Sequence, residues 1–196
     1  ARGRRDTDPP TISVTLSDGT LRAYAGRHWV FAWSHENSLS IGQIHCALAA
    51  LERWLCDLVD TGADIEARIE YLLKTTNSVA VLGVLVNVGK HKPELFKGPL
   101  RPLLAVLEMF EWDDDRVRAH ASSFDAGAWA PKGDFVFEMA KTWGLAPYRQ
   151  TRLREIVSRL ILGDRDIAEF VLACTSQWTA PVTEKEKLEF KILLSE

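Results

Sequence analysis

The chain has 196 residues, of which 46% are hydrophobic and 26% are charged. This composition is typical of a globular protein with a packed core and excludes a largely disordered chain. The formal net charge of −3 argues against a dedicated surface for duplex nucleic acid, because proteins with such surfaces are usually strongly basic. No apolar run approaches the roughly 18 residues that a membrane-spanning helix needs, so we expect no membrane contact.

The three cysteines, Cys46, Cys56 and Cys174, all lie in apolar runs with helical spacing. An odd number with this placement favours buried free thiols in a reducing, cytoplasmic compartment over a disulfide framework. The sequence begins with an arginine-rich cluster and ends within an amphipathic run, Leu188–Leu194. We therefore expect a piece of a longer protein, with a disordered tail over residues 1–10.

Residues 11–36 have the pattern of a β-hairpin or small sheet. Thr11–Leu16 alternates apolar and polar residues, and an Asp-Gly pair follows, which suits a tight turn because glycine tolerates positive φ. Leu21–Tyr24 is the expected return strand, and His28–Trp33, aromatic and β-branched, is the expected third strand. A sheet this small needs a partner for its apolar face, so we expect it to dock on the helices that follow.

Residues 40–196 are predicted to form a helical domain. Ser40 and Gln43 have the spacing of a capping box, and apolar residues then recur at helical spacing. Gly62 suits the end of this first helix, and Asp64 suits the cap of a second one. The short link predicts that the two helices form an antiparallel helical hairpin.

Ser78–Val88 is the most apolar run in the chain, and two structures are open for it. Its valines favour a buried strand, whereas its length and its helical neighbours favour a buried helix. We prefer the helix, with Gly83 allowing close packing and with Gly89 and Pro93 ending it. The remaining expected elements are helices at Pro99–Phe110, at Asp134–Gly144, at Thr151–Leu162, from Asp164 and from Thr183, with a loop at Ala119–Pro131.

Helices that come in pairs with short links are typical of HEAT or armadillo arrays, in which neighbouring helices bury each other's apolar faces. The sequence shows no convincing fixed repeat, so we predict an irregular helical array. The predicted fold is thus mainly α, with a short N-terminal β-hairpin or small sheet. A compact domain of orthogonal helices is the alternative.

The segment Gly83–His91 looks at first like a phosphate-binding loop. Such a loop has four residues between its glycines, then Gly-Lys and a Ser or Thr whose hydroxyl binds magnesium. Here five residues separate Gly83 from Gly89, and His91 stands in the hydroxyl position. The intervening residues are almost wholly apolar, as in a packed element. We therefore expect no nucleotide and no other cofactor.

Catalytic and metal sites are not apparent in the sequence. His45 and Cys46 are adjacent, and adjacent helical residues diverge by roughly 100°. A core cysteine beside a partly exposed histidine is therefore favoured over a nucleophile with its base. The three aspartates at 113–115 lack the alternate spacing and the glycine of a calcium loop, which favours a solvated turn or helix start. We predict no catalytic residue and no metal ligand.

The densest basic patch outside the N-terminus is formed by Lys90, Lys92, Lys97 and Arg101, which are the candidate partner-binding residues. The patch either contacts an anionic partner or is a solvated helix end, where the helix dipole favours cations. Together with a second cluster, the arginines at positions 149, 152 and 154, it is the basis for a nucleic-acid-binding alternative.

Seven tryptophans are many for this length. Tryptophan is enriched in binding hot spots. However, Trp54 lies near an apolar helical stripe, and Trp29 and Trp33 alternate with apolar residues. Core packing is therefore the expected role of most of them.

Three segments carry a resemblance to known proteins: Ala47–Leu55, Asn77–Leu85 and Val88–Phe96. They are similar to helical segments of very large bacterial signal-transduction ATPases with numerous domains, some of which act in defence against phage. The resemblance covers about residues 40–112 and rests on helical packing patterns. It implies a sensor or scaffold arm whose ATPase core lies elsewhere in the chain, and no functional residue carries over.

The function predicted from the sequence is a non-catalytic helical scaffold or protein-recognition segment of a larger multidomain intracellular protein. Its expected partner is another domain of the same chain or another protein. A nucleic-acid contact module is the first alternative. A small enzyme that uses Cys46 or an acidic pair is the second.

Overall fold

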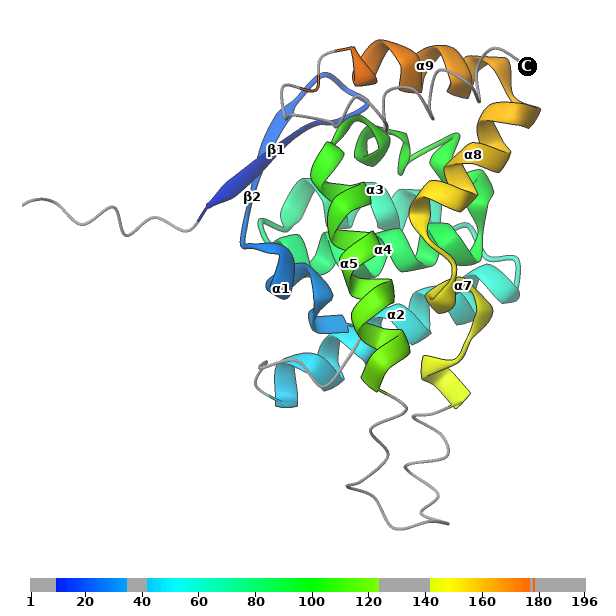
Figure 1. Ribbon diagram of the computed structural model, residues 1–196. Coiled ribbons are helices and arrows are strands. Elements are labelled where there is room, and N and C mark those ends of the chain that lie inside the picture. The colour runs from blue at the N-terminus through cyan, green and yellow to red at the C-terminus, as the bar shows by residue number, and fades with distance from the viewer. Residues whose placement is uncertain (1–9, 35–41, 124–141, 177, 179–196) are drawn as a thin grey trace, which may run out of the picture.

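A computed structural model of the chain describes residues 10–34, 42–123, 142–176 and 178. These residues form a mainly helical body with one two-stranded antiparallel sheet, built from the start of the chain (Figure 1). The predicted mainly α class with a small N-terminal sheet is therefore confirmed. Four predicted features lie wholly or mostly outside the described residues: the tail at 1–10, the cap at Ser40, the helix at Asp134–Gly144 and the helix from Thr183.

The elements in chain order, with η for a 3-10 helix, are β1 (Thr11–Thr15), β2 (Leu21–Ala25), α1 (His28–Phe31), η1 (Ala32–Ser34), α2 (Gly42–Asp60), α3 (Glu66–Thr75), α4 (Val79–His91), η2 (Pro93–Phe96), η3 (Arg101–Ala105), α5 (Leu107–Ser123), α7 (Pro147–Gln150), α8 (Leu153–Gly163) and α9 (Arg165–Thr175).

The N-terminal hairpin joins β1 to β2 through the predicted Asp-Gly turn. Gly19 has a φ of +82°, a left-handed conformation that glycine adopts without a Cβ clash. The apolar side of the hairpin faces the helices, where the fully buried Tyr24 donates a hydrogen bond from its hydroxyl to the backbone oxygen of Leu73 at 2.6 Å. The hairpin therefore contacts α3 through Tyr24.

The third strand predicted at His28–Trp33 is wrong, because these residues form the helical turns α1 and η1. Gly26, with a φ of +134°, redirects the chain after β2. The helical turn then packs Phe31, which is fully buried, against α4. A short aromatic and β-branched run fits a strand or a buried helical turn equally well, and here the packing on α4 decided between them.

The turn signals between α2 and α3 act as predicted. Gly62 has a φ of +72°, which ends α2 in the left-handed conformation common at helix C-termini. The Asp64 carboxylate accepts a hydrogen bond from the Glu66 N–H at 3.1 Å and so caps the start of α3. The main helical neighbour of α2 is α4, the next helix but one.

Helix α4 lies at the centre of the helical body. Eleven of its 13 residues are buried, and α1, α2, α3, α7 and α8 pack against it (Figure 1). The preference for a helix over a strand at Ser78–Val88 is confirmed, since a helix with neighbours on every side needs apolar residues on every side. Of the two residues predicted to end it, Gly89 lies inside the helix, whereas Pro93 acts as predicted, since α4 stops at His91.

Gly83 allows α1 to lie close to α4, and its replacement gives a testable prediction. A Cβ atom at this position would lie 2.2 Å from the backbone oxygen of Phe31. We expect Gly83→Ala to lower the free energy of unfolding by about 1–3 kcal/mol, the usual cost of overpacking a core, as measured by thermal unfolding. Gly163→Ala is the control, because a Cβ there meets nothing within 4 Å. Equal stability of the two variants would contradict the close packing.

The single helix predicted at Pro99–Phe110 is wrong. The 3-10 turn η3 occupies the first part of this region, and α5 begins only at Leu107. Val106, between the two, has an extended backbone conformation and so interrupts the helix. The loop predicted at Ala119–Pro131 is wrong in its first part, since α5 extends to Ser123.

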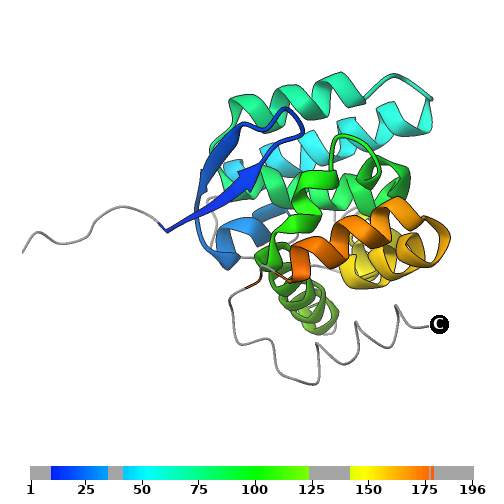
Figure 2. The ribbon, with the colours of Figure 1, turned by 90° about the horizontal axis from the view of Figure 1, so that it is seen from above.

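Near the end of the described chain, the two predicted helices α8 and α9 are confirmed and pack side by side (Figure 2). The Asp164 carboxylate caps α9 by accepting hydrogen bonds from Asp166 and Ile167. Helices from both halves of the chain therefore surround α4, as in the compact domain that was the alternative to a stacked array. None of the described helices combines the length and the apolar character that crossing a membrane requires.

Candidate functional site

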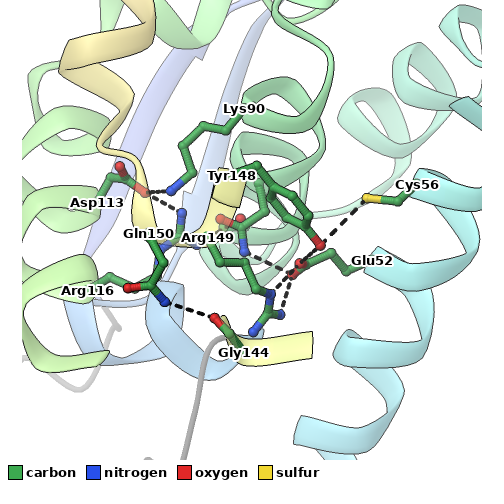
Figure 3. A network of polar contacts seen from close by, with 11 residues as sticks. Glu52, Cys56, Lys90, Asp113, Arg116, Gly144, Tyr148, Arg149 and Gln150 are labelled. Atoms are coloured by element: carbon green, nitrogen blue, oxygen red, sulfur yellow. Dashed lines mark hydrogen bonds and ion pairs between the residues drawn. The ribbon is translucent and has the colours of Figure 1, made fainter. Parts of the chain in front are cut away.

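The core of the described chain contains a set of buried polar and charged residues: Glu52, Asn87, Lys90, Asp113, Asp114, Arg116 and Arg149. Most of them form two neighbouring clusters against α4 (Figure 3). We call the first the Glu52 cluster (Glu52, Asn87, Tyr148 and Arg149) and the second the Lys90 cluster (Lys90, Asp113 and Arg116). Together they are the buried network.

In the Glu52 cluster, four donors from two other helices converge on one carboxylate of α2. The Arg149 guanidinium donates from Nε and Nη2 to the two carboxylate oxygens, at 2.9 Å each. The Asn87 amide donates at 2.9 Å and the Tyr148 hydroxyl at 3.1 Å. Glu52 and Asn87 are fully buried, and Arg149 is only 2% exposed. A carboxylate held this way cross-links α2, α4 and α7.

In the Lys90 cluster, the fully buried Asp113 carboxylate of α5 binds two cations and one backbone group. The Lys90 ammonium lies 2.9 Å from it, and the Arg116 guanidinium contacts the same oxygen. Its other oxygen accepts a hydrogen bond from the Leu153 N–H at 2.6 Å, at the start of α8. Arg116 also donates to the backbone oxygen of Gly83 at 2.9 Å. This cluster therefore cross-links α4, α5 and α8.

Helical spacing links the two clusters along α4 and brings two members of the Lys90 cluster together on α5. Asn87 and Lys90 are three residues apart on α4, and Asp113 and Arg116 are three apart on α5. Residues at this spacing lie on the same face of a helix. The two clusters thus lie side by side along α4, inside an otherwise apolar core.

The charges of the Lys90 cluster are two cations on one carboxylate. Burial lowers the pKa of Lys90 to about 8, against the neighbouring Asp113 charge, which raises it. Burial by itself raises the pKa of Asp113, but the charges of Lys90 and Arg116 hold that pKa below its ordinary value. Asp113 is therefore ionised at neutral pH, and the cluster carries one surplus positive charge while Lys90 is protonated. The Glu52 cluster, with one carboxylate and one guanidinium, is neutral.

Cys56 lies beside the Glu52 cluster, where its thiol is 3.9 Å from the Tyr148 hydroxyl. Burial, together with the nearby Glu52 charge, raises the pKa of the thiol to about 12. Burial and the same carboxylate also raise the pKa of Tyr148. Both groups stay protonated at neutral pH, so Cys56 is a packed thiol and not an activated nucleophile.

The solvated turn predicted for the three aspartates at 113–115 is wrong. They lie within α5, where Asp113 is fully buried and Asp114 is 5% exposed. Asp114 pairs with Arg154 of α8 at 3.2 Å, and only Asp115 is exposed. A run of acids is usually solvated, but here Lys90 of α4 and Arg154 of α8 supply opposite charges from other helices, in addition to Arg116 of α5 itself.

The structure places the residues of the predicted basic patch in different environments. Lys90 is 3% exposed and pairs with Asp113, so it is wrong as a partner-binding residue. Lys97 binds Asp164 at 2.8 Å, and the Arg101 guanidinium lies 4.5 Å from the ring centre of Phe170. Lys92 is half-buried. In the second basic cluster, the guanidinium at position 149 is buried on a carboxylate and the one at 154 pairs with an aspartate.

The structure also places the other residues singled out from sequence. His45 Nδ1 lies 2.8 Å from the backbone oxygen of Trp33, and Cys46 is exposed rather than in the core. The segment that looked like a phosphate-binding loop is the interior of α4. Core packing is wrong for Trp29 and Trp54, which are 46% and 48% exposed. The core does partly bury Trp33, Trp112, Trp143 and Trp178.

Sequence reasoning missed Glu52, Asn87 and Tyr148, and it assigned Arg149 to a basic surface although this residue is buried on Glu52. One signal was present: Glu52 stands four residues from both Leu48 and Cys56, which are buried, and so occupies the apolar face of α2. A charge on such a face needs a buried partner. The partner is 97 residues away, and no local pattern identifies it.

The arrangement fixes helices relative to one another. Its charged groups are paired inside the core, and burial keeps them from solvent. Within the described residues, no group of three or more His, Cys, Asp or Glu side chains is placed to hold a metal ion. The chain matches no model of a known protein family, and no curated protein matches it either.

Proposed function

We propose that this chain is a non-catalytic helical scaffold or protein-recognition segment of a larger multidomain protein. Its partner is another domain of the parent protein or a separate protein. The observation that carries the proposal is an exposed, uncharged face of α2 next to a rigidly cross-linked core.

The exposed face of α2 has the character of a protein contact. No charged residue occurs in α2 before Glu52, and the exposed side chains of this stretch are Gln43, Ile44, Cys46, Ala47 and Ala50. Trp54 continues the face one turn further on and is 48% exposed. The exposed Arg53–Asp57 ion pair, at 2.8 Å, lies at its end. A large aromatic anchor with charges only at the rim is typical of interfaces. We name these residues, with Trp54, the α2 face.

The buried network supports the scaffold part of the proposal. It joins five helices (α2, α4, α5, α7 and α8) from distant parts of the chain, so the α2 face is held on a pre-organised body. Pre-organisation reduces the entropy lost on association, which favours binding by a preformed surface. A helix of the partner with an apolar stripe fits this face, because its small residues allow two helix backbones to approach closely.

A cytoplasmic location agrees with the cysteine chemistry. All three cysteines of the chain are described, and all three are free thiols. Free thiols persist in reducing compartments. The resemblance to large bacterial signal-transduction ATPases supports a sensor or scaffold role in the same compartment, with antiviral defence as the setting.

The experiment is a pull-down of the remaining domains of the parent protein, produced separately, by the immobilised chain. We expect Trp54→Glu to lower the affinity about 30-fold, because removal of an aromatic hot spot costs about 2 kcal/mol or more. Tyr71→Glu on α3 is the matched control, since Tyr71 is a 66% exposed aromatic residue outside the α2 face. It should bind as the unchanged chain does.

Two results would refute the proposal. Equal capture by the Trp54 and Tyr71 variants would remove the α2 face as the contact. A complete reading frame that encodes no further domain, in a protein that captures no partner, would remove the scaffold function. An ATPase or effector domain in the same reading frame is the expected finding.

A further inference from the structure

The outer side of β1 faces no other strand among the described residues. The Pro10 oxygen accepts a hydrogen bond from the Gly26 N–H, and the Leu16 N–H donates one to the Thr20 oxygen, both at 2.9 Å. The main-chain groups of Pro10 and Leu16 therefore point toward β2. These groups alternate sides along an antiparallel strand. The N–H and C=O groups of Thr11, Ser13 and Thr15 therefore point to the outer side.

The two edges of the hairpin differ. On the outer side of β2, the Ala25 N–H donates to the Asn77 oxygen at 2.7 Å, and Ala25 bridges to Ser78. Natural edge strands are usually protected from further pairing by charges, prolines or bulges. The β1 sequence, Thr-Ile-Ser-Val-Thr, contains no charge and no proline, and its residues favour the extended conformation. The edge of β1 is therefore a ready template for one more strand.

A hollow of about 340 Å³ lies at the start of this edge. Its lining includes residues 10–12 at the start of β1 together with Trp29 and Trp112. The volume is near the lower end of the range for small-ligand pockets, roughly 300–1,000 Å³. Trp29 is 46% exposed, so the hollow opens to solvent. The size and the aromatic walls suit one large apolar side chain.

Arg27 adds a positive charge at the hollow. Its exposed guanidinium lies 5.2 Å from the ring centre of Trp29. Glu108 lines the same hollow but makes no ion pair with Arg27. The charge is thus open to a carboxylate from outside, and the stacked ring holds it in place.

We propose that β1 binds an extended segment of a partner protein as a third strand of the hairpin. One large apolar side chain of that segment fills the hollow between Trp29 and Trp112, and a carboxylate two residues away, on the same face, pairs with Arg27. Main-chain hydrogen bonds provide the affinity in such strand addition, and the side-chain pocket provides the specificity. The inference rests on the proposed function only in that the chain recognises a protein, and it uses a surface separate from the α2 face.

The test uses the full chain and a capped synthetic peptide, acetyl-Thr-Val-Phe-Thr-Glu-Val-Thr-amide. We expect binding in calorimetry and slower amide hydrogen exchange at Thr11, Ser13 and Thr15. Ser13→Pro removes one outward N–H, and proline is tolerated on an edge strand where that group faces solvent. We expect it to weaken binding about tenfold or more through the lost hydrogen bond and the blocked edge. The matched control, Ser13→Ala, keeps the N–H and should bind normally.

A second variant, at Arg27, changes the charge beside the hollow and leaves the sequence of β1 unchanged. Arg27→Glu should weaken binding of this peptide about tenfold and strengthen binding of the version with Lys in place of Glu. It also keeps the proposal testable if Ser13→Pro fails to fold.

Several outcomes would overturn the proposal. They are an absence of peptide binding by the unchanged chain, equal binding by Ser13→Pro and Ser13→Ala, and exchange protection outside β1. A wild-type dimer that Ser13→Pro converts to a monomer, without peptide binding, would show that a second copy supplies the strand. None of these outcomes changes the effect of Trp54→Glu on capture, so failure here is distinct from failure of the proposed function.

Discussion

Glu52→Leu is expected to lower the free energy of unfolding by about 3–5 kcal/mol, the usual cost of removing one partner of a buried ion pair. Arg149 is 2% exposed and would be left inside the core without its counter-charge. The Asn87 amide and the Tyr148 hydroxyl would also lose the acceptor on which they converge. Denaturant unfolding followed by circular dichroism measures the loss.

The control for this prediction is a double-mutant cycle. Arg149→Leu alone should be destabilising too, because it leaves the Glu52 carboxylate buried and unpaired. The double variant, Glu52→Leu with Arg149→Leu, should be more stable than either single variant, since replacing both partners leaves no uncompensated charge. Additive losses in the double variant would show that the two side chains do not act as a pair.

Asp113→Asn is expected to have a comparable effect, a loss of about 3–5 kcal/mol. Asp113 is the carboxylate that both Lys90 and Arg116 contact, and Asn keeps its shape but not its charge. Two cations would remain side by side in a buried site. Lys90→Met should be much less destabilising, because it removes the surplus cation and leaves Asp113 with Arg116 as a balanced pair. A larger loss for Lys90→Met than for Asp113→Asn would contradict this account of the charges.

The pH dependence of stability provides a second readout of Lys90. Its pKa is about 8 in the folded chain, against an ordinary value of 10.5. Between these values the unfolded chain binds more protons at this site, so the free energy of unfolding should rise with pH relative to that of Lys90→Met. Comparison with the variant is needed because the pKa values of Tyr24, Tyr148 and Cys56 are raised by burial and act in the opposite direction. A difference that stays constant from pH 8 to pH 10.5 would refute the assignment.

Features that depend on a few neighbouring residues were predictable from the sequence. The left-handed turns at Gly19 and Gly62 and the helix caps at Asp64 and Asp164 are examples. In each, the group that stabilises the conformation is within four residues of the backbone that it stabilises. The helical identity of α4 was also predictable, because its apolar run is too long and too closely flanked by helices for a strand.

The roles of the charged residues were not predictable in the same way. Lys90 and the aspartates of α5 have the pattern of solvated charges, and local sequence contains nothing that opposes this interpretation. Their burial depends on contacts across 23 residues for Lys90 with Asp113 and across 97 for Glu52 with Arg149. Such contacts form only when α4, α5 and α7 are already packed.

The sequence by itself therefore determined the helical class, the N-terminal hairpin and most of the turns and caps, because these follow from backbone preferences and apolar periodicity over short distances. Only the tertiary structure decided which charges are buried, that His28–Trp33 is helical, and that no described strand pairs with the outer edge of β1. These features follow from which surfaces meet, and a buried charge is stable only where a distant partner compensates the loss of its hydration.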